Sequence, residues 1–180
     1  MFEKIIDAGK AEVEINGLRV KVKGERGELE RDFTDPRYRD IVKIEKKDGR
    51  IRVYTTNDRR FYKAIVGTIA AHIKNMIIGV TKGFICKLKV NFAHFPVTIE
   101  QKGNELHIKN FMGEKGIRKS KLVGDVKVKI EKDIVTIEGN NIEEVMQSAA
   151  NLEFVTKVSK KDRRVFGDGC FIMYRGVLNE

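Results

Sequence analysis

Tryptophan is absent from the 180-residue sequence, which has only two prolines, two cysteines and three histidines. Two cysteines, Cys86 and Cys170, without a CxxC spacing exclude a disulfide framework and a metal site built from thiolates alone. We expect a reducing compartment, with both thiols free and at least half-buried. The histidines have no partners at ligand spacing, so we expect no metal ion and no cofactor.

The motifs of common catalytic sites are also missing. The sequence contains no GxSxG, no HExxH, no P-loop lysine and no GxGxxG. Asp162 and Asp168 are a candidate carboxylate pair, but the neighbouring arginines keep both ionised and therefore unsuited to acid catalysis. We therefore expect that the protein is not an enzyme.

Long apolar runs are absent as well. The longest apolar window, residues 64–73, is too short to cross a bilayer and contains His72. The first ten residues hold no apolar stretch of signal-peptide length. We expect a soluble, cytoplasmic protein with no membrane partner.

Positive charge is in excess. The 36 Lys and Arg residues outnumber the 26 Asp and Glu residues, which gives a net charge of +10, and 41% of the residues are hydrophobic. That hydrophobic fraction allows a buried core and excludes a disordered chain. The charge favours a polyanionic partner, with nucleic acid ahead of an anionic membrane.

A weak internal repeat, at a spacing of about 83–86 residues, organises the chain. Each half has a strand pair around a glycine, at 20–29 and 106–115, and then two alternating strands, at 41–58 and 125–141. The expected turns within the later pairs are Asp48-Gly49 and Lys132-Asp133.

An amphipathic helical segment closes each half. In the first, Asn57 or Asp58 is the candidate N-cap and Gly79 the candidate stop. The apolar positions of this segment recur every four residues: Phe61, Ile65, Ile69, Ile73 and Ile77. The second segment combines a candidate cap with a capping-box spacing: Asn140 or Asn141, with Glu143 and Glu144.

These patterns predict an α+β fold of two similar small domains from internal duplication, each a mostly antiparallel sheet packed by one helix. The predicted domains are 1–80 and 81–180, with the joint near 79–84. Chance similarity between two amphipathic halves is the alternative.

Two basic clusters lie in the second half and are the candidate RNA-binding residues. The first has no counterpart in the first half, so we expect it to serve binding rather than complete a core: Lys157, Lys160, Lys161, Arg163 and Arg164. The second is expected in a loop at the sheet rim: Lys115, Arg118, Lys119 and Lys121. Phe166 either stacks on a base or anchors the tail in the core. The alternative for both clusters is a solvated charged face.

Several stretches together resemble the universal large-ribosomal-subunit protein L-six family, in its archaeal and eukaryotic form. They cover almost the whole chain in order: VKGERGELERDF at 22–33, TIAAHIKNMIIGVTKGF at 68–84, AHFPV at 93–97, IKNFMGEKGIRK at 108–119, IEGNNIEEVMQSAA at 137–150 and KDRRVFGDG at 161–169.

The resemblance implies two similar α+β domains and binding to large-subunit rRNA, mostly through the C-terminal domain and its basic segment. It also implies a single copy per ribosome among neighbouring ribosomal proteins, close to the sarcin–ricin loop and to the docking region of translational GTPases. No catalytic residue and no cofactor is implied. The alternatives are an RNA-binding regulator outside the ribosome and an enzyme that acts on nucleic acid.

Overall fold

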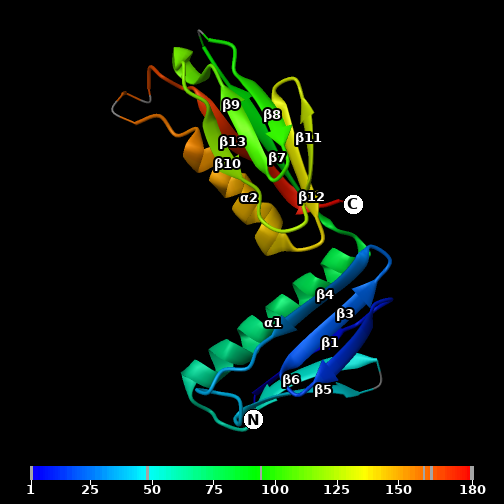
Figure 1. Ribbon diagram of the computed structural model, residues 1–180. Helices are drawn as coiled ribbons and strands as arrows, with labels where there is room; N and C mark the ends of the chain where they lie inside the picture. The colour runs from blue at the N-terminus through cyan, green and yellow to red at the C-terminus, as the bar shows by residue number, and fades with distance from the viewer. Residues whose placement is uncertain (1, 48, 94, 160, 163, 179–180) are drawn as a thin grey trace. The chain divides into compact units, whose positions relative to one another are not determined.

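The structure is a computed structural model that describes residues 2–47, 49–93, 95–159, 161–162 and 164–178. The chain divides into two compact units, Met1–Lys82 (unit 1) and Gly83–Glu180 (unit 2). Each unit is described separately below, with the elements labelled as in Figure 1.

Unit 1 combines two three-stranded antiparallel sheets with one helix in its described residues. One sheet has the strand order β1-β6-β5 and the other β2-β3-β4. The element bounds are β1 (Phe2–Asp7), β2 (Glu12–Asn16), β3 (Arg19–Gly24), β4 (Gly27–Asp32), β5 (Val42–Lys47), β6 (Arg50–Thr55) and α1 (Arg60–Thr81).

The core of unit 1 lies between the helix and the strands. Val20 and Val22 on β3 and Ile51 and Val53 on β6 are fully buried, and the residues between them on each strand are more exposed. This alternation is the period of two that a half-buried strand requires. The buried face of α1 joins the same cluster through Val66, Ile69, Ala70, Ile73, Met76, Ile77 and Val80.

The predicted ends of α1 are wrong at both termini. Arg59 is the N-cap and has no side-chain capping bond, because a guanidinium cannot accept a hydrogen bond from the helix amides. Asn57 Oδ1 accepts from the Arg59 amide ahead of the helix. The helix also continues through Gly79, which is buried, and ends at Thr81. The carbonyl of Val80 accepts from Arg26 N at 3.0 Å, which satisfies a terminal carbonyl that the helix itself leaves unpaired.

A close approach fixes the β3–β4 hairpin against this helix end. A side chain at Gly24 would place its Cβ 2.7 Å from the carbonyl oxygen of Val80. Glycine is therefore the residue that lets the hairpin backbone reach the last turn of α1.

By length and composition α1 is long and apolar enough to span a membrane. From the shorter apolar window at 64–73 alone we expect no segment of that length. The core helix of a soluble protein meets the same criterion. In unit 1 one face of α1 is buried against the strands, whereas Lys63, partly exposed, pairs with Asp58 and Lys74 is exposed. The helix thus has the amphipathic character of a packed surface helix.

Unit 2 contains a three-stranded sheet of order β10-β9-β8 and a four-stranded sheet of order β11-β12-β7-β13, both antiparallel. The element bounds are β7 (Phe84–Asn91), β8 (Thr98–Lys102), β9 (Glu105–Lys109), the short helix η1 (Phe111–Gly113), β10 (Arg118–Lys121), β11 (Lys127–Glu131), β12 (Ile134–Gly139), α2 (Ile142–Val155) and β13 (Gly169–Val177).

The two units repeat one order of elements. Each runs through a single strand, a three-stranded meander, a hairpin and a helix, and the single strand pairs with the second strand of the hairpin. The predicted α+β fold of two similar domains is therefore confirmed. The strand pairing beside the predicted turns also agrees: Lys47 pairs with Arg50, with Gly49 at a φ of 74° and Asp48 outside the described residues, and Glu131 pairs with Ile134.

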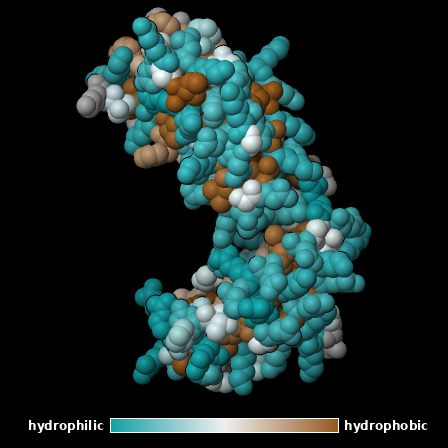
Figure 2. All heavy atoms as spheres, in the orientation of Figure 1, coloured by the Kyte–Doolittle hydropathy of each residue, from teal (hydrophilic) through white to brown (hydrophobic). Residues whose placement is uncertain are grey.

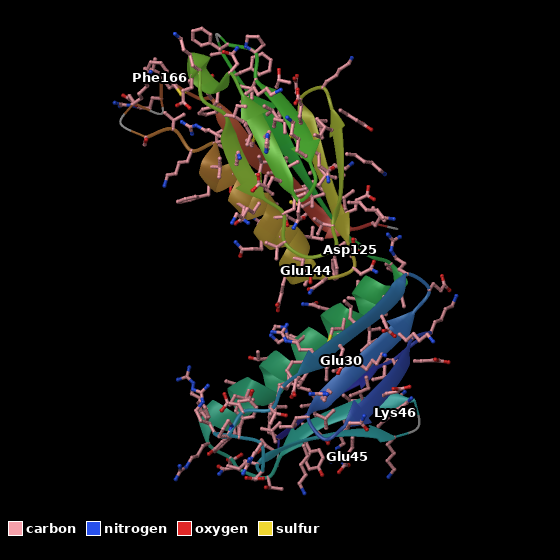
Figure 3. The ribbon with its side chains drawn as sticks, viewed as in Figure 1. Glu30, Glu45, Lys46, Asp125, Glu144 and Phe166 are labelled. Carbon is pink, nitrogen blue, oxygen red and sulfur yellow. The ribbon has the colours of Figure 1, made fainter. Side chains whose placement is uncertain are left out.

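The start of α2 confirms Asn141 as the predicted N-cap, but its hydrogen bonds to Glu143 and Glu144 are not those of the predicted capping box. The Asn141 side chain accepts from Glu143 N at 3.1 Å and donates from Nδ2 to Glu144 Oε1 at 3.0 Å. Glu144 also lies against Gly124, where a Cβ would be 2.0 Å from its carboxylate, so the strand connection before β11 passes directly over the helix start. Figure 3 shows Glu144 and Asp125 at this end of unit 2.

Strand β13 has no counterpart in unit 1, and it corrects the expectation that the C-terminal addition does not complete a core. It pairs with β7 over most of its length, with a register shift at Met173. Cys170 is 1% exposed, and Gly169 before it is also buried. The addition therefore consists of a surface loop followed by a sheet-completing strand.

Candidate nucleic-acid interface

The loop that joins α2 to β13 is here called the basic loop and covers residues 157–168. Its base is closed by a hydrogen bond from the amide of Cys170 to Thr156 Oγ1, at 2.9 Å. Asp168, which is buried, accepts from the amide of Ala93 at 3.1 Å, and Val158 is also buried. Both ends of the basic loop are therefore anchored in unit 2.

The predicted cations of this loop that the structure describes are all exposed: Lys157, Lys161 and Arg164. Lys160 and Arg163 lie outside the described residues. Figure 1 shows the loop projecting from unit 2 beyond the end of α2. Its charge is therefore displayed on the surface of a segment whose ends are fixed.

Two contacts organise the tip of the basic loop. Arg164 makes a forked pair with Asp162, with its Nη2 2.8 Å from Oδ2, and this hydrogen bonding lowers the pKa of Asp162. Lys161 Nζ lies 4.6 Å from the ring centroid of Phe166, which is half-buried and labelled in Figure 3. Phe166 therefore makes a cation–π contact with Lys161.

Only part of the second predicted cluster lies in a loop. Lys115 is in an irregular segment, whereas Arg118, Lys119 and Lys121 belong to β10, which pairs with β9. The prediction of one rim loop is therefore wrong for these three residues. Lys119 and Lys121 are exposed because the alternation of the strand buries Ser120 between them.

Arg118 differs from its neighbours because its donors are used inside unit 2. Its guanidinium bonds both carboxylate oxygens of Glu114 and donates to the carbonyl of Val155 at 2.7 Å. The same group lies 4.4 Å from the centroid of the Phe111 ring. A cation on the last carbonyls of α2 also complements the helix dipole. Arg118 is therefore built into the fold and less free to meet an external anion.

The two basic clusters adjoin one another. β10 lies along α2, where Asn151 Nδ2 donates to the carbonyl of Lys121 at 3.0 Å. At the start of β10, Arg118 Nη1 donates to the carbonyl of Val155 at 2.7 Å, two residues before the basic loop begins. Segments far apart in the sequence thus bring both sets of cations to the C-terminal end of α2.

Sequence reasoning missed further exposed residues of unit 2. Lys87 and Lys89 alternate with buried residues on β7, and Lys87 Nζ lies 5.9 Å from the Tyr174 ring centroid. Phe154 on the last turn of α2 is 75% exposed. The alternating CKLKVN run indicates the two lysines, but no local pattern indicates that Phe154 faces solvent.

Metal binding and thiol reactivity were the other candidate chemistries. The described residues contain no group of three or more His, Cys, Asp or Glu side chains that could hold a metal ion. Cys86 and Cys170 are free and buried, as predicted. Burial raises the pKa of both thiols, that of Cys170 to about 11, so both stay protonated and unreactive at neutral pH.

Several charges on the strands of unit 1 are paired. Lys21 pairs with Glu28, and Arg19 with Glu30 and Asp32. Figure 2 shows that the visible face of each unit is mostly hydrophilic with small apolar patches. Exposed ion pairs of this kind contribute little to stability.

Comparison with known proteins agrees with the repeat. The model of the family described as Ribosomal protein L6 matches residues 9–83 and again residues 95–169. The large ribosomal subunit protein uL6 of Staphylothermus marinus is 48% identical over 175 residues, which are 96% of this chain and 93% of that protein. The uL6 proteins of Ignicoccus hospitalis and Sulfurisphaera tokodaii are 47% and 43% identical, over 93% and 99% of this chain and 91% and 94% of those proteins. The chain belongs to the ribosomal protein L6 family.

Proposed function

We propose that the protein is a structural constituent of the large ribosomal subunit and binds large-subunit rRNA mainly through unit 2. The observation that carries the proposal is the convergence of the basic loop and β10 around the end of α2. The names of the relatives and the net charge of +10 support the same partner.

The proposed binding surface consists of the nine predicted residues with unequal roles. Lys157, Lys161, Lys119 and Lys121 are exposed point charges for phosphate oxygens. Lys115 is exposed beside them. Arg164 offers a forked donor once it leaves Asp162, and Arg118 holds the surface together. Lys160 and Arg163 remain proposed contacts on the sequence alone.

Affinity is proposed to come from phosphate neutralisation and from shape. Lysine and arginine side chains on RNA phosphates release counterions, so binding weakens steeply as salt rises. The grooves of an RNA duplex offer side chains little base recognition, so unpaired nucleotides carry the sequence-specific part.

The finer placement follows from the family resemblance. We propose one copy per subunit, in the cytoplasm, next to other ribosomal proteins and near the sarcin–ricin loop, where translational GTPases dock. No catalytic step is proposed for the chain. A nuclease assay with magnesium and large-subunit rRNA tests this, and protein-dependent cleavage would contradict it.

Sedimentation tests the proposed assembly directly. The protein should co-migrate with large subunits on a sucrose gradient after a high-salt wash, because a built-in constituent holds many contacts at once. A protein that the wash releases completely would instead be an RNA-binding regulator outside the ribosome. Replacing Lys157, Lys161, Lys119 and Lys121 by alanine should increase the washed-off fraction.

A further inference from the structure

Unit 2 has a pocket next to the proposed phosphate contacts. It encloses about 670 Å³ between the outer face of α2, the basic loop and the start of β13. Its lining residues come from those three elements and include Phe154, Phe166, Phe171, Gln147 and Lys157. Its volume is within the range of small-molecule sites in proteins.

The lining combines aromatic surface with amide groups. Phe154 is 75% exposed and Phe171 is 43% exposed, which is costly for large apolar side chains that have no partner. Gln147 Nε2 donates to Asn151 Oδ1 at 2.9 Å, and Asn151 Nδ2 donates to the carbonyl of Lys121, so the amide oxygen of Gln147 is the acceptor that this wall offers a ligand. Rings that stack and amides that form hydrogen bonds are groups with which proteins hold an unstacked nucleobase.

Charges of both signs line the pocket. Glu153 and Asp168 contribute carboxylates, and Asp168 is buried whereas Lys157 is exposed. Lys161, also exposed, lies over the ring of Phe166, another lining residue. A nucleotide fits these charges with its phosphate at the exposed lysines, away from the carboxylates, and its base against the rings.

We propose that this pocket binds the base of one unpaired nucleotide of the RNA, stacked on Phe154, with its flanking phosphate at Lys157 and Lys161. The carboxylates of Glu153 and Asp168 in the lining accept hydrogen bonds from an exocyclic amino group, so the base is adenine, cytosine or guanine rather than uracil. The proposal rests on the proposed rRNA binding and specifies a nucleotide site within it.

The exposed lysines favour RNA over a protein segment as the occupant. A cationic side chain of a neighbouring protein would suit the aromatic rings and the carboxylates, but Lys157 and Lys161 would repel it. A neutral peptide would bring no anion to these lysines. A nucleotide brings a phosphate to the lysines and an exocyclic amino group to the carboxylates.

Binding of the full-length chain to protein-free cognate large-subunit rRNA tests the proposal. Phe154→Ala should weaken binding roughly 5- to 140-fold, because a base stacked on an aromatic ring contributes in that range, and it should leave the salt dependence unchanged. Phe154→Trp should restore most of the affinity. Phe61→Ala is the matched control, since Phe61 is also helical and 50% exposed but lies in unit 1; its affinity should stay within about twofold.

Base-specific chemical probing of the same complexes identifies the occupant. Wild type should protect the Watson–Crick edge of one unpaired adenine, cytosine or guanine, and Phe154→Ala should expose that edge while the backbone footprint persists. Equal affinity of Phe154→Ala and wild type, with no such protected base, overturns the proposal. Loss of a neighbouring ribosomal protein from Phe154→Ala subunits, with rRNA affinity intact, overturns it in favour of a protein occupant. If wild type itself fails to bind rRNA, the proposed function fails and this site fails with it.

Discussion

The hydroxyl oxygen of Thr156 accepts a hydrogen bond from the amide of Cys170 at 2.9 Å and lies in the buried interior of unit 2. The same hydroxyl donates to the carbonyl of Leu152 at 3.0 Å. One side chain thus joins the last turn of α2 to the first residues of β13. The basic loop, with its exposed cations, starts and ends at this junction.

Thr156→Val should destabilise the protein by about 1–3 kcal/mol, because the isosteric methyl group leaves the buried amide of Cys170 without an acceptor. Urea unfolding of both proteins gives the difference. Thr156→Ser keeps the acceptor and should retain most of the stability. A Val variant as stable as wild type would show that the junction does not hold the loop.

Arg118→Ala should lower the free energy of unfolding by about 1–3 kcal/mol, since it removes charged hydrogen bonds to Glu114 and to the carbonyl of Val155. Lys119→Ala, on the same strand but exposed, should change it by no more than about 0.5 kcal/mol. Thermal unfolding of the two variants decides between a structural and a purely surface role for Arg118. Equal stabilities would return Arg118 to the group of RNA-binding cations.

The basic loop should contribute more rRNA affinity than any other stretch of equal length. Replacing Lys160, Lys161, Arg163 and Arg164 by alanine should weaken binding and reduce the slope of log K against log salt by about 0.7–0.9 for each RNA phosphate that is no longer neutralised. Folding should stay nearly intact, because Lys161 and Arg164 are exposed. Filter binding at several salt concentrations measures both the affinity and the slope.

A matched set of unit 1 lysines controls for net charge. Lys10, Lys43, Lys47 and Lys74 are exposed and carry the same total charge. Lys46 is left out because its Nζ donates to the carbonyl of Val13 at 3.0 Å. If this variant binds rRNA as weakly as the loop variant does, the main rRNA-binding segment is not the basic loop.

Alkaline pH should destabilise the protein partly through Cys170. Burial raises the pKa of this thiol from 9.0 to about 11, so between these values the unfolded chain ionises it while the folded chain does not. The corresponding stability is fully present below about pH 9 and is lost as the pH rises towards 11. The stability difference between wild type and Cys170→Ala should therefore shrink over this interval. A constant difference would argue against a buried, neutral thiol.

Local chemistry explains which elements could be predicted from the sequence. The Asn141 cap, the Lys132-Asp133 turn and the alternation of β7 depend on residues close in the chain, and each was predictable. The C-terminal end of α1 could not be predicted, because the carbonyl of Val80 accepts a hydrogen bond from Arg26 on a hairpin distant in the sequence. This tertiary contact favours a helix that continues through Gly79.

The interface was predictable as a set of cations but not as an arrangement. Sequence spacing could not show that Arg118 donates to Val155, or that Asn151 donates to Lys121, since these pairs depend on how β10 packs along α2. Strand β13 was missed because the polar loop before it dominates the local composition, whereas pairing with β7 decides its structure.

Cross-linking of the protein to rRNA in intact large subunits, mapped to both residue and nucleotide, tests the central claim most directly. We predict that the cross-links concentrate in unit 2, on the basic loop and on Lys115, Lys119 and Lys121, and that a single nucleotide cross-links to Phe154. Cross-links confined to unit 1, or none to the basic loop in subunits that contain the protein, would contradict this account.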